Sequence, residues 1–434
     1  MDSDFQTRLS SRVADIQVSA GIPSVLVAVG LGGVVRAVAV SGYADVEAKQ
    51  VATSESCYRI GSITKTFTAA LTLLLAERGA MGLDDPIAKF LPGTPFGHVP
   101  LRMLLSHTSG LQREAPTDMW ESMQGPSPTQ LREMFSRVEF VAQPGQRWHY
   151  SNLGYAILGQ VIESILGRSC ESAITATLLE PLGLEHTCWN RPDDAMIGYR
   201  LDPFVATVHR EPVMDQGAVG VGGQMWSTAG DLLRWGYVLT GGEPEVLPGN
   251  VIEKMHTLHV MVDTAGWTRG WGLGLILERR DDTVVSGHTG AMPGFQSALV
   301  LDRPTGMAVT VLTNITRGVT PGDLATDILR EAIAEQPSPP TPEWRPATCP
   351  AHISPLLGSW WSEADETVFR WEIDGLHAYL ASAPATTDTR FVEEGPGRFR
   401  AAHGRFQGEL LLVTDAGSGI EMRWATYPFT RSPR

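Results

Sequence analysis

The alternation of apolar and polar positions predicts a sheet built from both ends of a large first body. Residues 25–29 and 34–40 are apolar runs joined by the turn 30–33, which predicts a β-hairpin. Residues 296–301 and 307–312 are similar runs separated by Asp-Arg-Pro-Thr-Gly, which predicts another hairpin. We expect these two hairpins to lie in one sheet, which strands from the two ends of the body complete.

Helical periodicity appears between those hairpins and just after the second one. Residues 64–78 place apolar side chains every three or four positions, which predicts a helix. Residues 152–167 predict a second helix, with Ser151 or Asn152 as its N-cap. Residues 320–334 predict a closing helix. The first body is therefore a mixture of sheet and helix.

A change of pattern divides the chain. Residues 336–350 contain six prolines, which predicts a linker between a first domain, 1–335, and a second domain, 351–434. The second domain shows short alternating runs with turn signals at Asp374-Gly375 and Asp415-Ala416-Gly417, which predicts a small antiparallel sheet or barrel. The runs are 359–361, 368–373, 377–380, 398–401, 410–413 and 422–426.

Composition and charge exclude several classes of function. The 434 residues are 43% hydrophobic and 19% charged, as in a globular protein with a large core. A net charge of −14 excludes a general nucleic-acid binder, and no polybasic stretch marks a membrane surface. The apolar stretch 25–35 is too short and too broken by glycine for a signal or a membrane span. Because no export signal is visible, we expect a cytoplasmic protein, and its four cysteines are too few for a disulfide framework, so we expect them to be reduced.

One lysine stands out chemically. Only four of the 34 basic residues are lysines, so a retained lysine suggests a need for an amine that can lose its proton. Lys65 follows Ser62 by three residues, a spacing that places both side chains on one face of the predicted helix. Burial would lower the pKa of the amine, as a base requires. Taken alone, an N-cap serine followed by a solvated lysine explains the pattern equally well.

Two further triplets carry candidate chemistry. In Tyr150-Ser151-Asn152, the tyrosine can relay a proton and the amide can bond a substrate, although helix capping explains the triplet as well. His288-Thr289-Gly290 lies beside predicted strands, where an edge strand would pair with an extended peptide. A histidine in a loop between strands is the alternative.

Other catalytic or metal-binding motifs are missing from the sequence. It contains no GxSxG, HExxH, GxxxxGK or GxGxxG. His256 and His259 lie three residues apart on an expected helix, but no third ligand is near, so a surface pair is the better interpretation. We expect no metal and no cofactor.

The triplets S-x-x-K, Y-S-N and H-T-G, in this order, resemble the serine acyl-enzymes that include class C β-lactamases, D-Ala-D-Ala carboxypeptidases, related esterases and D-aminopeptidases. The resemblance spans residues 5–335. It implies an α/β (α+β) β-lactamase/transpeptidase-like domain with an antiparallel sheet flanked by helices, followed by a small all-β, lipocalin-like domain. Supporting segments are GYAD (42–45), RIGSITKTFTA (59–69), LDDPIAKFLP (83–92), LRMLLSHTSGL (101–111), PLGLEHT (181–187), STAGDLLRW (227–235) and GHTGAMPGF (287–295).

The resemblance also implies roles for individual residues. Ser62 is the expected nucleophile, and Lys65 and Tyr150 share the work of general base and acid. Substrate is expected to contact Asn152, His288, Thr289 and Gly290, and the oxyanion hole is expected at the backbone N–H groups of Ser62 and Ala291. His107 lies in a segment that this family uses for packing, so we leave it out of the site. The tryptophans expected around the site are Trp120, Trp226, Trp267 and Trp271.

The position of His288 narrows the choice within the family. Most class C β-lactamases carry lysine there, whereas histidine is seen in some actinomycete carboxypeptidases and in penicillin-binding-protein-type thioesterases. The thioesterases release and macrocyclise nonribosomal peptides and carry a lipocalin-like domain. We therefore favour a thioesterase or peptide cyclase that takes a D-residue at the acyl donor, with a peptidyl thioester as substrate and a peptidyl carrier protein as partner. The alternatives are a cytoplasmic D-amino-acid-specific peptidase or carboxypeptidase, an esterase, a class C-like β-lactamase, and a penicillin-binding sensor that never turns over.

Overall fold

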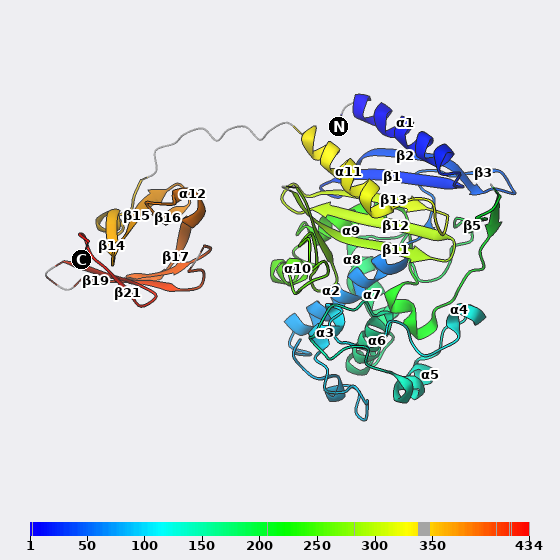
Figure 1. Ribbon diagram of the computed structural model, residues 1–434, viewed down its shortest axis with the longest axis horizontal. Coiled ribbons are helices and arrows are strands. Elements are labelled where there is room, and N and C mark those ends of the chain that lie inside the picture. The colour runs from blue at the N-terminus through cyan, green and yellow to red at the C-terminus, as the bar shows by residue number, and fades with distance from the viewer. Residues whose placement is uncertain are drawn as a thin grey trace. The chain divides into compact units, whose positions relative to one another are not determined.

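The computed structural model describes residues 1, 3–205, 207–281, 283–336, 348–404, 406–415, 417 and 419–433. The chain divides into two compact units, Met1–Pro337 and Ser338–Arg434 (Figure 1). Most of the linker that the prolines predict, residues 337–347, lies outside the described residues. Each unit has a hydrophobic core of its own.

The described part of the first unit contains a nine-stranded antiparallel sheet in the order β3-β2-β1-β13-β12-β11-β10-β9-β8. β1 pairs with β2 and, on its other side, with β13, so strands from opposite ends of the unit are neighbours, as the sequence predicts. The strands are β1 Ser24–Leu31, β2 Val34–Asp45, β3 Gln50–Val51, β8 Val260–Met261, β9 Arg269–Trp271, β10 Ile276–Arg280, β11 Thr283–Met292, β12 Phe295–Asp302 and β13 Met307–Thr313. Two short two-stranded sheets are separate from this nine-stranded sheet: β4 Tyr58–Arg59 pairs with β7 Trp226–Ser227, and β5 Tyr199–Leu201 pairs with β6 Val208–Arg210.

Helices cover both faces of the sheet. α1, Ser3–Ser19, and α11, Pro321–Ala334, pack on one face, where they share a core with alternate residues of β1 and β13 (Figure 1). α9, Ala229–Leu239, packs on the opposite face, where α2, Thr64–Glu77, and α6, Asn152–Leu166, belong to the same core. The three predicted helices are thus confirmed within a residue or so at each end.

Shorter helical segments complete the first unit. The α-helices are α3 Leu101–Leu105, α4 Met119–Ser122, α5 Pro128–Glu133, α7 Cys170–Ile174, α8 Glu180–Leu182 and α10 Gly249–His256. The 3-10 turns are η1 Gly61–Ile63, η2 Ile87–Lys89, η3 Met134–Arg137 and η5 Gly217–Gly222, and η4 Thr175–Leu179 is a π-helical turn.

The second unit is an eight-stranded antiparallel meander that nearly closes into a barrel. Its first and last strands meet where Trp361 and Thr430 exchange backbone hydrogen bonds of 2.8 and 2.9 Å. The predicted all-β character is confirmed, but the sequence runs did not predict β17 or β21. The elements are η6 Ser354–Leu356, β14 Gly358–Ser362, β15 Asp365–Glu372, β16 Gly375–Leu380, α12 Pro384–Thr387, β17 Thr389–Gly395, β18 Arg398–Ala401, β19 Leu410–Asp415, β20 Ile420–Trp424 and β21 Tyr427–Phe429.

Candidate active site

Ser62 lies where η1 leads into α2, against strand β11. Gly61 has a φ of +51°, and a Cβ at this position would come within 2.7 Å of the Ala291 backbone nitrogen. On the facing strand, a Cβ on Gly290 would collide with the carbonyl oxygen of Ile60. The two backbones approach this closely because both positions are glycine. The contact brings Ser62 beside Ala291, so their N–H groups belong to one small region, as the expected oxyanion hole requires.

Lys65 is fully buried directly beneath Ser62. Its Nζ donates hydrogen bonds to Ser62 Oγ at 3.1 Å and to the Gly222 carbonyl oxygen at 2.6 Å. The pKa of this amine is lowered to about 7, chiefly by burial; the charge of Glu114 opposes the shift and that of Arg113 adds to it. A large fraction of Lys65 is therefore neutral near pH 7, when its Nζ can accept the proton of Ser62.

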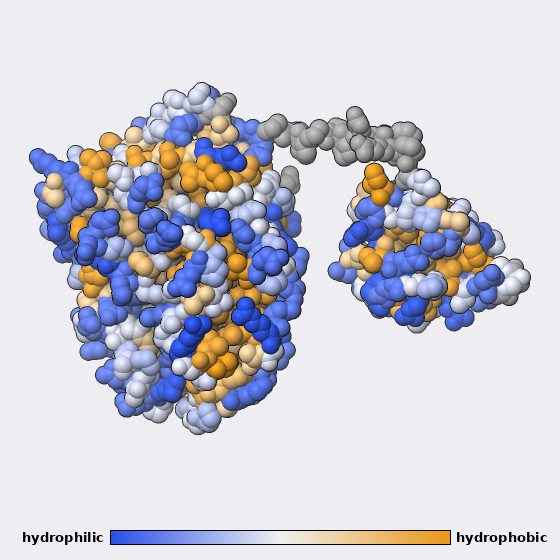
Figure 2. Space-filling view, turned by 180° about the vertical axis from the view of Figure 1, so that it is seen from behind, coloured by the Kyte–Doolittle hydropathy of each residue, from blue (hydrophilic) through white to orange (hydrophobic). Residues whose placement is uncertain are grey.

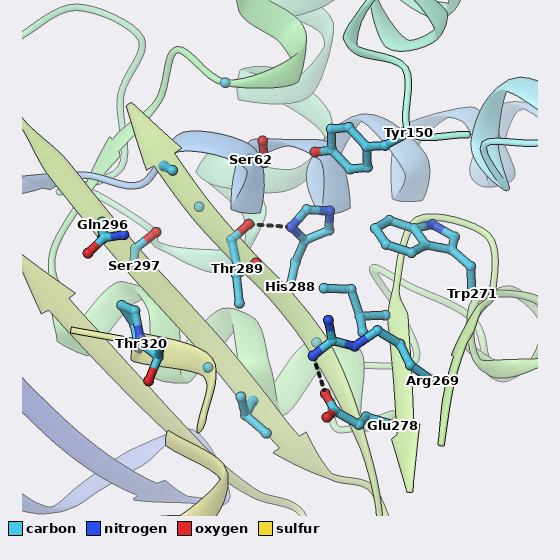
Figure 3. A pocket seen from close by; sticks show the side chains of 18 of the residues that line it. Ser62, Tyr150, Arg269, Trp271, Glu278, His288, Thr289, Gln296, Ser297 and Thr320 are labelled. Atoms are coloured by element: carbon cyan, nitrogen blue, oxygen red, sulfur yellow. Dashed lines mark hydrogen bonds and ion pairs between the residues drawn. The ribbon is translucent and has the colours of Figure 1, made fainter. Parts of the chain in front are cut away.

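Tyr150 completes a group of three around Ser62. Its hydroxyl points toward Ser62 (Figure 3), and its ring centroid lies 5.0 Å from Lys65 Nζ. Burial raises the pKa of the phenol well above its ordinary value, and the nearby Ser62 hydroxyl offsets this only in part. Tyr150 is therefore a neutral phenol near pH 7 and can donate or relay a proton, whereas Lys65 is the group able to accept one.

His107 supports Tyr150 from behind. The two ring centroids are 4.3 Å apart, and His107 Nδ1 accepts a hydrogen bond of 3.1 Å from the Ser151 backbone N–H. The His107 side chain is fully buried, and this burial lowers its pKa well below the ordinary value, so it stays neutral. It does not line the cavity over Ser62, in keeping with the packing role expected for it.

The start of α6 holds the Tyr-Ser-Asn triplet in place. Ser151 is the N-cap, and its Oγ accepts a hydrogen bond of 3.0 Å from the Gly154 N–H. Asn152, the first helical residue, lines the cavity and donates from Nδ2 to Glu114 Oε1 at 2.6 Å. The triplet therefore caps α6 through Ser151 and also contributes Asn152 to the cavity lining.

Arg113 and Glu114 are site residues that the sequence reasoning missed. The Arg113 guanidinium lies 4.9 Å from the Tyr150 ring centroid, and both residues line the cavity. Burial raises the pKa of Glu114, and its Oε2 is buried without a hydrogen-bond partner among the described residues. No motif spacing connects residues 113–114 with Ser62, so only the folded chain reveals this pair.

Strand β11 changes character halfway along its length. It pairs with β10 from Thr283 to Gly287, and with β12 from Ser286 to Met292. In the described ladders, the segment from His288 to Met292 has no partner on the β10 side, and it borders the cavity (Figure 3). The H-T-G triplet therefore lies on an edge segment, and the alternative of a histidine in a loop is wrong.

His288 stays neutral in this environment. Its side chain is 3% exposed, and its Nδ1–H donates to the Thr289 carbonyl oxygen at 2.5 Å. Burial and then the charge of Lys65 lower the pKa of His288 to about 3. Because Nδ1 carries the proton, Nε2 presents a lone pair, and this buried atom has no partner among the described residues. His288 is therefore a hydrogen-bond acceptor here, which a protonated lysine could not be.

A cavity of about 830 Å³ opens over these groups. Its lining includes seven of the eight predicted site residues: Ser62, Tyr150, Asn152, His288, Thr289, Gly290 and Ala291. Lys65, the eighth, lies beneath it with its Nζ bonded to Ser62.

The aromatic walls differ in part from the prediction. Trp120 and Trp271 line the cavity, as does Trp148, which the sequence reasoning missed. Trp226 is instead 1% exposed and packs on Phe295 in the core. Trp267 is 74% exposed and is not a lining residue. Position in a site-forming segment was thus a weak guide to where an indole points.

The pair His256 and His259 also differs from the prediction. α10 ends at His256, so the two residues are not on one helix. His256 is half-buried, and its Nε2 lies 3.0 Å from Ser286 Oγ, whereas His259 is exposed. The prediction of a surface pair on one helix is therefore wrong, because only His256 belongs to α10 and only His259 is exposed.

Comparison with known families now places the chain. Residues 9–334 match the family model described as Beta-lactamase. The chain belongs to this family. Its membership indicates a β-lactamase-like serine hydrolase. Residues 349–431 match a domain of unknown function, DUF7586.

Individual relatives agree with this placement. Penicillin-binding protein 4 of Amycolatopsis lactamdurans is 28% identical over 71% of this chain and 85% of its own length. Several other curated relatives are matched over only 48–61% of their length. A D-stereospecific amidohydrolase from Streptomyces sp. superposes with a TM-score of 0.64 at 26% identity, covering 75% of this chain and 97% of that chain. SurE, at 22% identity and a TM-score of 0.63, covers 99% of both chains and shows the fold of both units.

The described residues contain no helix that is long and apolar enough to cross a membrane.

Proposed function

We propose that the chain is a serine acyl-enzyme in which Ser62 attacks an acyl carbonyl. The observation that supports this most directly is Lys65 Nζ, 3.1 Å from Ser62 Oγ, with a pKa of about 7. As the Oγ–carbonyl bond forms, the Ser62 proton passes to neutral Lys65. The backbone N–H groups of Ser62 and Ala291 stabilise the oxyanion.

Tyr150 supplies the proton on the leaving-group side. Its hydroxyl points toward Ser62, and its ring lies against Lys65, so we infer that it passes the proton from Lys65 to the departing thiol or amine. Asn152 Nδ2 and the free edge of β11 hold the acyl chain. An attacking amine or water then reverses the sequence and releases Ser62.

The more specific proposal, which names the substrate, is a thioesterase that releases and macrocyclises a peptide with a D-residue at the acyl donor. A cavity of about 830 Å³ is near the upper end of the range for ligand pockets, roughly 300–1,000 Å³, and so accommodates several residues. Indole walls from Trp148 and Trp271 shield an ester from water, and close positioning favours an internal amine over a bimolecular rival. A peptidyl carrier protein in the cytoplasm would present this substrate.

A second candidate is a D-stereospecific amide hydrolase. Its support is the likeness to the D-stereospecific amidohydrolase and to a D-amino acid amidase of Ochrobactrum anthropi SV3, which is 27% identical with a TM-score of 0.66. Both candidates use the same acyl-enzyme, and they differ in whether an amine or water resolves it.

Matched peptidyl thioesters with a D- or an L-residue at the C-terminal end separate the candidates. Products are identified by mass, and the Ser62→Ala variant measures background reaction. Cyclic product from the D-substrate alone supports the cyclase, whereas linear acid alone supports the hydrolase. A stable acyl-enzyme without product indicates a sensor. Full activity in Ser62→Ala contradicts the acyl-enzyme itself.

A further inference from the structure

The barrel of the second unit has a cavity of its own, separate from the active site. Its volume is about 220 Å³. The lining residues come from the ends of β14, β16 and β20, the starts of β15, β17 and β21, and the connections between them. In an up-and-down meander these connections all lie at one end, so the cavity is the mouth of the barrel. Eight-stranded barrels have room for side chains or for one small ligand.

The walls of this mouth are aromatic. Tyr379, Phe406, Trp424, Tyr427 and Phe429 line it, and the Phe406 and Trp424 ring centroids are 4.9 Å apart. Rings of this kind offer a large apolar surface, and their faces attract cations. The mouth therefore suits a ligand with an apolar body.

One wall residue carries an unused hydrogen-bond donor. Trp424 is 6% exposed, and its Nε1 is buried with no acceptor among the described residues. Trp360, in the same barrel, shows the ordinary outcome, because its Nε1 donates to the Leu356 carbonyl oxygen at 2.7 Å. Since a buried donor without a partner destabilises the folded state, an acceptor on a ligand would remove that penalty.

The rim of the mouth is acidic. Glu363 and Asp365 lie in and beside the β14–β15 turn, and both line the cavity and are exposed. In the part of the chain that the structure describes, neither carboxylate forms an ion pair within 4.0 Å. The rim therefore favours a positively charged group at the entrance.

We propose that the barrel mouth binds an α-amino amide with an apolar side chain, the chemistry of a free amino-acid amide or of a peptide's N-terminal residue. The apolar side chain occupies the aromatic walls, the ammonium faces Glu363 and Asp365, and the carbonyl oxygen accepts from Trp424 Nε1. This proposal does not rest on the activity proposed for Ser62. It assigns a ligand class to a domain whose matching family has no stated function.

The probe is L-phenylalanine amide added to the full-length chain carrying Ser62→Ala, so that the active site does not consume it. Binding is followed by ¹⁵N NMR of the tryptophan indoles, with Trp424→Phe identifying the Trp424 signal. We expect that signal to shift on titration. N-acetyl-phenylalanine amide, which lacks the charge, should bind about three- to tenfold more weakly. Phe-Gly-Gly-amide distinguishes the two possible ligands. A site for peptide N-termini should bind it, whereas a site for free amino-acid amides should reject it.

Matched variants test the rim. Glu363→Gln with Asp365→Asn should weaken the amide about three- to tenfold, whereas Glu421→Gln, an exposed carboxylate on β20 away from the mouth, should leave binding unchanged. Thermal unfolding of each variant reports whether the barrel remains intact. A Trp424 signal that stays still at saturating probe, or equal binding of charged and acetylated amides, overturns the proposal.

Discussion

Replacing Lys65 by arginine separates a base from a fixed positive charge. Lysine with a pKa of about 7 is about half neutral at pH 7. Arginine has an ordinary pKa far above 7 and would be almost entirely protonated at pH 7. The positive charge is kept, but the proton acceptor is lost. Because general base catalysis contributes about 10²–10⁴-fold, we expect kcat/KM to fall by that factor, nearly as much as we expect for Lys65→Ala.

The assay is kcat/KM for a D-configured thioester between pH 5 and 9. The natural chain should lose activity about tenfold per pH unit below the Lys65 pKa of about 7, because protonation removes the base. Lys65→Arg should show no such limb. Circular dichroism and thermal unfolding confirm that the buried site accepts the larger side chain. Retention of activity within tenfold in a folded Lys65→Arg variant would refute the assignment of Lys65 as the base.

Three further predictions follow from other contacts. Tyr150→Phe should lower the acylation rate severely, because it removes the hydroxyl that points toward Ser62; a mild effect in stopped-flow acylation would leave Lys65 to act alone. Glu114→Gln should move the acid limb of the pH profile to lower pH, because Glu114 raises the pKa of Lys65; an unmoved limb would mean that its charge does not reach the amine. Limited proteolysis should cut first within residues 336–350, and mass spectrometry should then find two intact fragments; early cuts inside the first unit would misplace the boundary.

Local pattern was enough to predict much of the fold. The hairpins of β1–β2 and β12–β13 were predictable because alternation and glycine turns are local signals. β17 was missed because Thr389–Gly395 ends in Glu-Glu-Gly and lacks a clear apolar alternation. The pairing of β11 could not be read from sequence, because whether a strand is an edge depends on how far its neighbour β10 extends.

The candidate site was likewise predictable only where its residues lie in short motifs. The triplets identified the residues that meet around Ser62, since each lies in a short motif. The partners that tune them lie elsewhere in sequence: the Gly222 carbonyl that accepts from Lys65, and Glu114, which bonds Asn152. Those contacts depend on packing between distant segments, and no spacing rule links them.

The pairing of β1 with β13 affects how the protein must fold during its synthesis. Val27 and Val311 are register partners, so about 280 residues are translated between them. At about 5–20 residues per second, β1 waits roughly 15–60 s for its second neighbour. During that time β2 covers one side of this buried apolar strand, and the other side is an open edge that invites pairing with another chain. The catalytic unit can therefore complete its sheet only when nearly all of it has left the ribosome, and β1 is the segment that most needs protection until then.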